Sequence, residues 1–192
     1  RFIFSRPVIL GSITLDLFAV LLGGATALLP IFAADIFLVD PFGLGLLRSA
    51  PAVGAFTMSL LLAHYPLRSK AGLRLFQVVA IFGLATIGFG LSTNFYVALG
   101  FLFVLGASDM VSVFIRFSLI QMETPDEMRG RVSAVNMLFI GASNELGEFE
   151  SGTLAAFVGP VKAVVIGGIG TILVAMLCAR KFPELYRRDQ LT

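Results

Sequence analysis

The sequence predicts an all-α integral membrane protein with six transmembrane helices. Of its 192 residues, 57% are hydrophobic and only 14% are charged, whereas soluble domains carry about 25% charged residues. A soluble domain of this length has too little interior to hide so much apolar surface. The apolar residues also form six separate runs, each close to the roughly 20 residues that a helix needs to cross a bilayer.

The six predicted spans cover residues 8–33, 43–63, 72–91, 95–121, 132–158 and 161–179. Turn-forming residues mark the breaks, among them Asp40-Pro41 and Gly159-Pro160. The first span continues directly into further membrane-type sequence, so we interpret it as a spanning helix and not as a signal peptide. The chain begins at Arg1 without a methionine, which suggests a fragment or a processed chain.

Basic residues predict the orientation of the spans in the membrane. Six alternating spans place most of them on one side, namely Arg1, Arg6, Arg68, Lys70, Arg74, Arg129, Arg131, Arg180, Lys181, Arg187 and Arg188. Cytoplasmic loops of membrane proteins carry an excess of lysine and arginine. We therefore expect a multi-pass protein with both termini in the cytoplasm.

Polar residues are unevenly distributed among the spans. The third and sixth spans are free of charge through their cores, whereas the first, fourth and fifth contain carboxylates. Two lipid-facing helices at a period of three are what two three-helix repeats would produce, an arrangement found in many secondary transporters. The sequence shows no clear residue-level repeat, so this prediction depends on polarity alone.

The fifth span carries polar residues on one half of its helical wheel. A charge at the centre of a bilayer costs roughly 2.5–3.5 kcal/mol on insertion scales, so such residues usually face a protein interior or a water-filled path. One interpretation is a substrate or proton site, and the alternative is a packed, hydrogen-bonded helix interface. The candidate residues are Asn136, Asn144, Glu145 and Glu148.

Three charged residues lie within the first and fourth spans. Asp109 and Arg116 share a face of the fourth span but are about 10.5 Å apart along its axis, too far for a direct pair. Asp16 lies at a depth similar to that of Arg116, and we expect the two to pair as an inner gate or anion site. The alternatives are a static buried pair or an arginine that reaches the membrane surface.

Two further features have both a functional and a structural interpretation. Arg48 and the outer-half glutamates, Glu148 and Glu150, are candidates for an outer-side gate, although Arg48 alone could be a surface anchor. The small residues 23–27 lie at the middle of the first span and permit bending there. They predict either a hinge for alternating access or close packing against a neighbouring helix.

Several classes of function are not supported by the sequence. The single Cys178 excludes an internal disulfide and a multi-cysteine metal site, and His64 is the only histidine. The chain has no phosphate-binding loop, no metal or cofactor motif and no dense basic run for nucleic acid. We expect no enzyme; a membrane enzyme using Ser143 and His64 is a minor alternative.

Four stretches together are similar to one family of membrane proteins. They are LDLFAVLLGGATALLPIFA at Leu15–Ala33, GLGLLRSAPAVGA at Gly43–Ala55, DMVSVFIR at Asp109–Arg116 and TPDEMRGRVSAVNMLFIGASNELGEFESG at Thr124–Gly152. They resemble the major facilitator superfamily, in its enterobactin-exporter-like branch of transmembrane secretion effectors. The resemblance covers the C-terminal six-helix half of such a transporter, and it implies that the N-terminal half is absent from this chain.

The resemblance implies half of a secondary active transporter in the bacterial cytoplasmic (inner) membrane. Proton-coupled export of a small organic molecule, siderophore or drug-like, by alternating access would be its function. Asp16, Asp109 and Arg116 would then line the cavity. The expected partners are the lipid bilayer, a missing six-helix half or a second copy, the substrate and protons. The alternative is a non-transporting membrane interaction module or homodimer.

Overall fold

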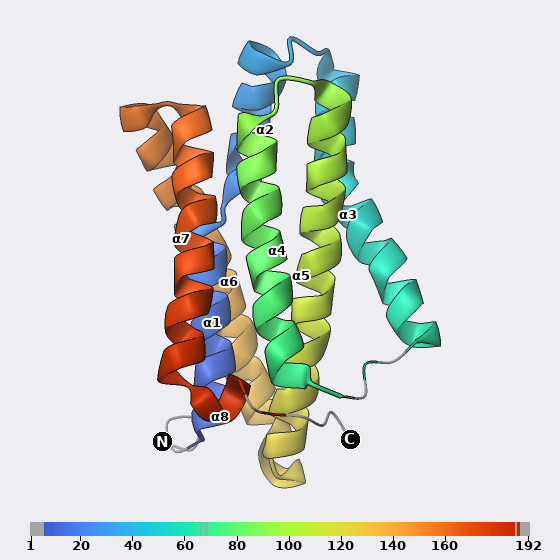
Figure 1. Ribbon diagram of the computed structural model, residues 1–192, viewed down its shortest axis with the longest axis vertical. Coiled ribbons are helices and arrows are strands. Elements are labelled where there is room, and N and C mark those ends of the chain that lie inside the picture. Colours follow the sequence, from blue (N-terminus) through green and yellow to red (C-terminus); the bar gives the residue numbers. More distant parts are fainter. Residues whose placement is uncertain (1–5, 66, 68, 187, 189–192) are drawn as a thin grey trace.

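The computed structural model describes residues 6–65, 67, 69–186 and 188, which form helices with no β-strand among them (Figure 1). Six helical segments lie side by side: α1 (Pro7–Leu22) with its continuation to Ile36, α3 (Pro41–His64), α4 (Ala71–Leu91), α5 (Phe95–Glu123), α6 (Arg129–Val158) and α7 (Pro160–Lys181). A short helix, α8 (Pro183–Tyr186), follows α7. A single turn, η4 (Asp126–Met128), precedes α6. The predicted fold class, an all-α protein, is confirmed.

The helix ends follow from local sequence signals. Asp40 caps α3, because its Oδ1 accepts a hydrogen bond from the backbone N–H of Gly43 at 2.8 Å. Asn94 caps α5 in the same way, with its Oδ1 2.9 Å from the N–H of Tyr96. Between α6 and α7, Gly159 has a φ of +88°, a conformation that favours glycine. Each long helix therefore begins at a defined break, close to the predicted boundaries.

The packing of the helices repeats after three elements. Helix α3 packs on α5 as α6 packs on α1, and α4 packs on α5 as α7 packs on α1. Helices α4 and α7 pack on each other. In this repeat of two helix triplets, α1 corresponds to α5, α3 to α6 and α4 to α7, and each of these contacts has its counterpart. The triplets run in opposite directions through the bundle, so that α1 begins and α7 ends at the same end (Figure 1). This arrangement supports the predicted pair of three-helix repeats.

Glycines allow the backbones to approach closely at the helix crossings. A Cβ atom on Gly54 of α3 would collide with the carbonyl oxygen of Phe103, and one on Gly106 of α5 would collide with that of Pro51. The α4–α7 crossing has a reciprocal pair as well, Gly83 with Gly168. At the α1–α6 crossing, a Cβ on Gly147 would lie 2.9 Å from the carbonyl oxygen of Val20. Small residues at interfaces are the usual basis of close helix packing within membranes. Glycines therefore permit the close backbone contacts at the helix crossings of both repeats.

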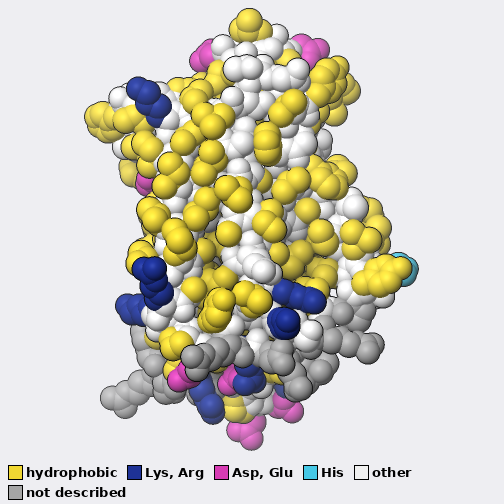
Figure 2. All heavy atoms as spheres, in the orientation of Figure 1, with side chains coloured by type: hydrophobic (Ala, Val, Ile, Leu, Met, Phe, Trp, Pro, Cys, Tyr) yellow, Lys and Arg dark blue, Asp and Glu magenta, His cyan; other side chains and the backbone are white. Residues whose placement is uncertain are grey.

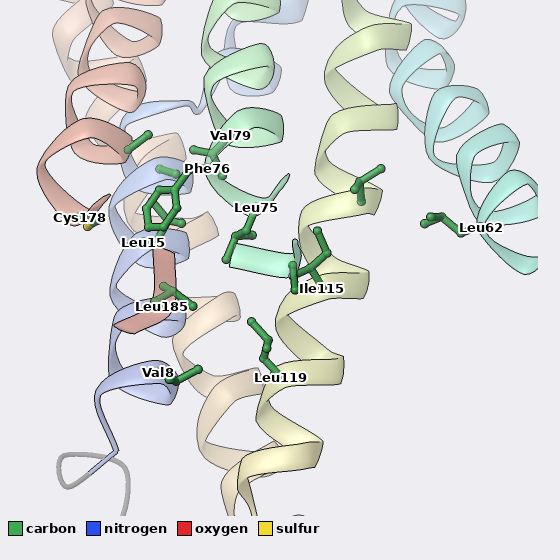
Figure 3. Packing of buried hydrophobic residues seen from close by; sticks show 14 residues of the cluster. Val8, Leu15, Leu62, Leu75, Phe76, Val79, Ile115, Leu119, Cys178 and Leu185 are labelled. Atoms are coloured by element: carbon green, nitrogen blue, oxygen red, sulfur yellow. The ribbon is translucent and has the colours of Figure 1, made fainter. Parts of the chain in front are cut away.

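Two larger apolar clusters, one toward each end of the bundle, form most of the core. The cluster near the ends of the chain includes Leu15, Leu75 and Ile115 (Figure 3). The opposite cluster is centred on Phe32 and Phe89, whose ring centroids lie 4.6 Å apart. Along α1, α3 and α5, the residues between these clusters line a cavity instead of packing tightly. The core therefore has a hollow middle layer.

The distribution of side chains on the outer surface is typical of a membrane protein. Figure 2 shows a broad hydrophobic band, with basic and acidic side chains gathered mainly near the ends of the bundle. Five of the described segments are long and apolar enough to cross a membrane: Pro7–Ile36, α3, α4, α5 and α7. Helix α6 has the length for the predicted fifth span but carries too many charged and polar side chains to meet that description. Its place as a span stays a prediction.

Candidate functional site

The first helix is broken at the middle of the bundle. Helix α1 ends at Leu22, and the chain continues as a 3₁₀ turn, η2 (Ala25–Leu28), a helical turn, α2 (Leu29–Ile31), and a π-helical turn, η3 (Phe32–Ile36). The sequence predicted bending at residues 23–27, and the break lies there. Gly24 also packs closely, since a Cβ on it would lie 2.7 Å from the carbonyl oxygen of Gly147 on α6. The bend and the close packing are thus both present in the structure, and a hinge for alternating access stays a prediction.

The break adjoins a central cavity of about 320 Å³. Helices α1, α3, α4, α5 and α6 and the η2 turn all contribute to its wall. Its polar side chains are Thr26, Asp109, Asn144 and Glu148, and Phe82 and Leu105 are among the apolar ones. Irregular backbone within a membrane is tolerated where it lines a cavity. The cavity therefore combines unwound backbone, two carboxylates and an amide in one place.

Asp109 also lines a smaller cavity on the side of the chain ends. This second cavity, about 20 Å³, has Asp16, Ser108 and Ser112 in its wall. That volume is enough for about one water molecule. Val20 and Phe82 are shared by both cavities. Asp109 thus lies between the central cavity and the first-helix carboxylate, Asp16.

Asp16 and Arg116 form a buried ion pair, as the sequence predicted. Arg116 Nη1 lies 2.5 Å from Asp16 Oδ2, and the two side chains are only 3% and 9% exposed. The contact is ionic and not a well-directed hydrogen bond, because Nη1 has no partner in hydrogen-bond geometry within the described part of the chain. Arg116 Nε donates to Ser112 Oγ at 3.2 Å, which fixes the guanidinium on α5. The ion pair joins α1 to α5 next to the small cavity, which Asp16 also lines.

The structure separates the polar residues of α6 that the sequence placed on one half of the helix. Asn144 and Glu148 line the central cavity. Asn136 is buried at 1% exposure and lines none of the cavities described here, and its Nδ2 has no hydrogen-bond partner among the described residues. Glu145 is exposed and also lines none of the cavities described here. The grouping of Asn136 and Glu145 with the pathway residues is therefore not reproduced within these six helices.

A third cavity, about 550 Å³, lies beside the break, on the side away from the chain ends. Arg48 and Glu148 both line it, together with the segment from Thr26 to Leu29. Arg48 forms no ion pair with an acidic side chain in the described ranges. Glu150, the other predicted member of an outer gate, is half-buried and is not part of this wall. The structure thus brings Arg48 toward Glu148 and leaves Glu150 apart.

The minor alternative of a membrane serine enzyme gains no support from the geometry. Ser143 is fully buried, and its Oγ lies 2.8 Å from the carbonyl oxygen of Phe139 in its own helix. His64 is exposed at the end of α3, where its Nδ1 lies 2.9 Å from the carbonyl oxygen of Leu60. The two side chains therefore belong to different helices, and each interacts with a backbone carbonyl of its own helix.

Phe82 is a cavity residue that sequence reasoning missed, since nothing distinguishes it among 19 phenylalanines.

Comparison with known proteins identifies the family. The family described as transmembrane secretion effector matches residues 5–191, which is nearly the whole chain. The chain belongs to the transmembrane secretion effectors of the major facilitator superfamily. The resemblance predicted from the four sequence stretches is thereby confirmed, and the chain is a multi-pass membrane protein of a transporter family.

A curated relative adds a measure of length. The chain is 26% identical over 191 residues to the enterobactin exporter EntS of Citrobacter koseri. The match takes in 99% of this chain but 45% of that relative. The chain therefore spans about half the length of the exporter it matches. Its six helices correspond to one half of such a protein.

Proposed function

We propose that these six helices are one half of a proton-coupled exporter of small organic molecules. The observation that carries the proposal is the central cavity, where Asp109, Asn144 and Glu148 meet the unwound part of the first helix. In many secondary transporters, substrate and ion sites lie near the bilayer midplane at such discontinuous helices. Membership in a transporter family and the similarity to an enterobactin exporter support the same conclusion.

Asp109 is the proposed proton carrier. It lies between the central cavity and the small cavity beside Asp16, so a proton bound at Asp109 has a route toward the buried pair. Intramembrane carboxylates commonly mark proton relays in transporters. In this proposal, protonation of Asp109 weakens its field at Arg116. The ion pair with Asp16 then acts as the inner gate that the sequence suggested.

A second six-helix half is the proposed partner, and it would cover α3 and α6. Both helices contribute to the wall of the central cavity and are related by the internal repeat. Both also leave large apolar side chains exposed, such as Phe56 on α3 and Phe149 on α6. The exposed Glu145 of α6 would be costly against lipid, which favours a protein partner on this face. Rocking of the two halves would then provide alternating access.

Efflux by the natural full-length protein in proteoliposomes tests this proposal. With an imposed proton gradient and a catecholate siderophore as the probe, we expect Asp109→Asn and Glu148→Gln to abolish gradient-dependent efflux. Each change removes a titratable group from the cavity while keeping nearly the same volume. Glu127→Gln is the matched control, because this exposed carboxylate precedes α6 and lies outside the cavities.

Two results would contradict the proposal. Unchanged efflux in both cavity variants would remove Asp109 and Glu148 from the transport path. A stable homodimer of the six helices that moves no probe under any gradient would favour the alternative, a membrane interaction module without transport.

A further inference from the structure

A surface groove between α1 and α7 lies outside the transport cavities. Its volume is about 570 Å³, which falls within the range of about 300–1,000 Å³ that is usual for ligand pockets. Phe18 of α1 and Leu177 of α7 are 43% and 61% exposed along it. The groove is near the end of the bundle where α1 begins and α7 ends (Figure 1). Its lining is therefore available to a ligand from the surrounding membrane.

Polarity in the groove changes with depth. Helix α1 runs away from this end and α7 runs toward it, so Phe18 and Val174 form the deeper part of the wall. Thr14, Arg180 and Lys181 form the part nearer the end of the bundle. Figure 2 shows basic side chains at the lower border of the hydrophobic band in this region. The groove is thus apolar inside and basic at its rim.

Among the described residues, no acidic side chain forms an ion pair with the two basic residues of the rim. Arg180 and Lys181 are both exposed, and neither forms an ion pair with an acidic side chain in the described part of the chain. Glu184, the acidic residue that follows them on α8, forms no such pair either. Two unneutralised cations beside an apolar groove favour a ligand that has an anionic head and a hydrocarbon tail.

We propose that this groove is a binding site for an anionic phospholipid of the membrane. One acyl chain lies along Phe18, Val174 and Leu177, and the headgroup phosphate lies between Arg180 and Lys181. Basic pockets between transmembrane helices on the cytoplasmic side are known to suit anionic headgroups. The predicted cytoplasmic location of this end matches the leaflet that is rich in anionic lipids. The site is independent of the transport cavities, because it shares no lining residue with them.

Lipid binding by the natural full-length protein, measured by native mass spectrometry, tests the proposal. Phosphatidylglycerol and phosphatidylcholine with identical acyl chains are titrated against the detergent-solubilised protein. We expect tighter retention of phosphatidylglycerol, with affinity falling about fivefold for each basic side chain removed from the rim in Arg180→Gln and Lys181→Gln. The matched control is the double variant Arg129→Gln and Arg131→Gln, which loses two charges at the same end of the bundle but outside the groove.

A variant that fills the groove distinguishes a specific lipid-binding site from nonspecific attraction by surface charge. Leu177→Trp leaves both cations in place and occupies the space of the acyl chain, and its side chain is exposed enough to tolerate the larger ring. We expect it to reduce phosphatidylglycerol retention as strongly as loss of the rim charges. Retention unchanged in Leu177→Trp, or reduced equally by the control pair, would overturn the proposal. An absence of preference for phosphatidylglycerol in the natural protein would also overturn it, because another segment would then cover the groove.

Discussion

Replacing Arg116 with methionine is expected to lower the free energy of unfolding by about 3–5 kcal/mol, because the change leaves Asp16 buried without a counter-charge. Asp16 and Arg116 are almost fully enclosed between α1 and α5, so bulk solvent does not screen the carboxylate once its partner is lost. The measurement is denaturant unfolding of the purified protein in detergent. A loss below about 1 kcal/mol would contradict the account of the pair.

The double variant Asp16→Asn with Arg116→Met provides the internal test. Removing both charges eliminates the unpaired carboxylate, so we expect the double variant to be more stable than Arg116→Met alone. The exposed pair of Arg129 and Asp126 serves as the comparison, since its side chains are 53% and 85% exposed. Arg129→Met is expected to cost less than about 1 kcal/mol because solvent screens that pair.

Adding one methyl group at Gly106 is expected to separate α3 from α5. The new Cβ would collide with the backbone carbonyl of Pro51, and a backbone atom cannot move aside as a flexible side chain can. We expect Gly106→Ala to destabilise the protein by about 1–3 kcal/mol, which is the usual cost of overpacking, or by more. The cost appears despite the gain of about 1 kcal/mol in helix propensity that alanine brings over glycine.

Gly100 provides a control on the same helix. A Cβ at this position meets nothing within 4 Å. Gly100→Ala is therefore expected to leave stability unchanged or to raise it. Thermal unfolding of both variants in the same detergent makes the comparison. Equal stability of Gly106→Ala and Gly100→Ala would show that the α3–α5 crossing does not depend on close backbone contact.

The pairing of Asp16 with Arg116 could be predicted because it depends on the depth of the two residues in the membrane. Counting residues from the ends of two apolar runs places both charges at a similar level. An unpaired charge at that depth is costly, which leaves few alternatives to a pair. The helices themselves were predictable for a similar reason, since the length of an apolar run and its polar breaks are properties of the sequence.

The roles of the α6 side chains could not be predicted in the same way. A helical wheel gives the angle between residues, but it does not say which neighbour occupies each angle. Asn136 is buried, Asn144 and Glu148 line a cavity, and Glu145 is exposed outside the cavities, although all lie on one predicted polar half. The separation follows from where α1 crosses α6, which is a matter of tertiary packing. The sequence likewise located the bend in the first helix without predicting its 3₁₀ and π-helical turns.

Side-dependent labelling of the central cavity tests the central claim most directly. In the natural full-length protein with Cys178→Ser, Asn144→Cys places a single thiol in the cavity of this half, and Leu138→Cys places one on the exposed apolar side of the same helix. A membrane-impermeant maleimide is added to each side of proteoliposomes in turn. The proposal predicts labelling at position 144 from both sides, in proportions that shift when a proton gradient is imposed, and no such labelling at position 138. Labelling at position 144 from neither side, or from one side only under every gradient, would contradict it.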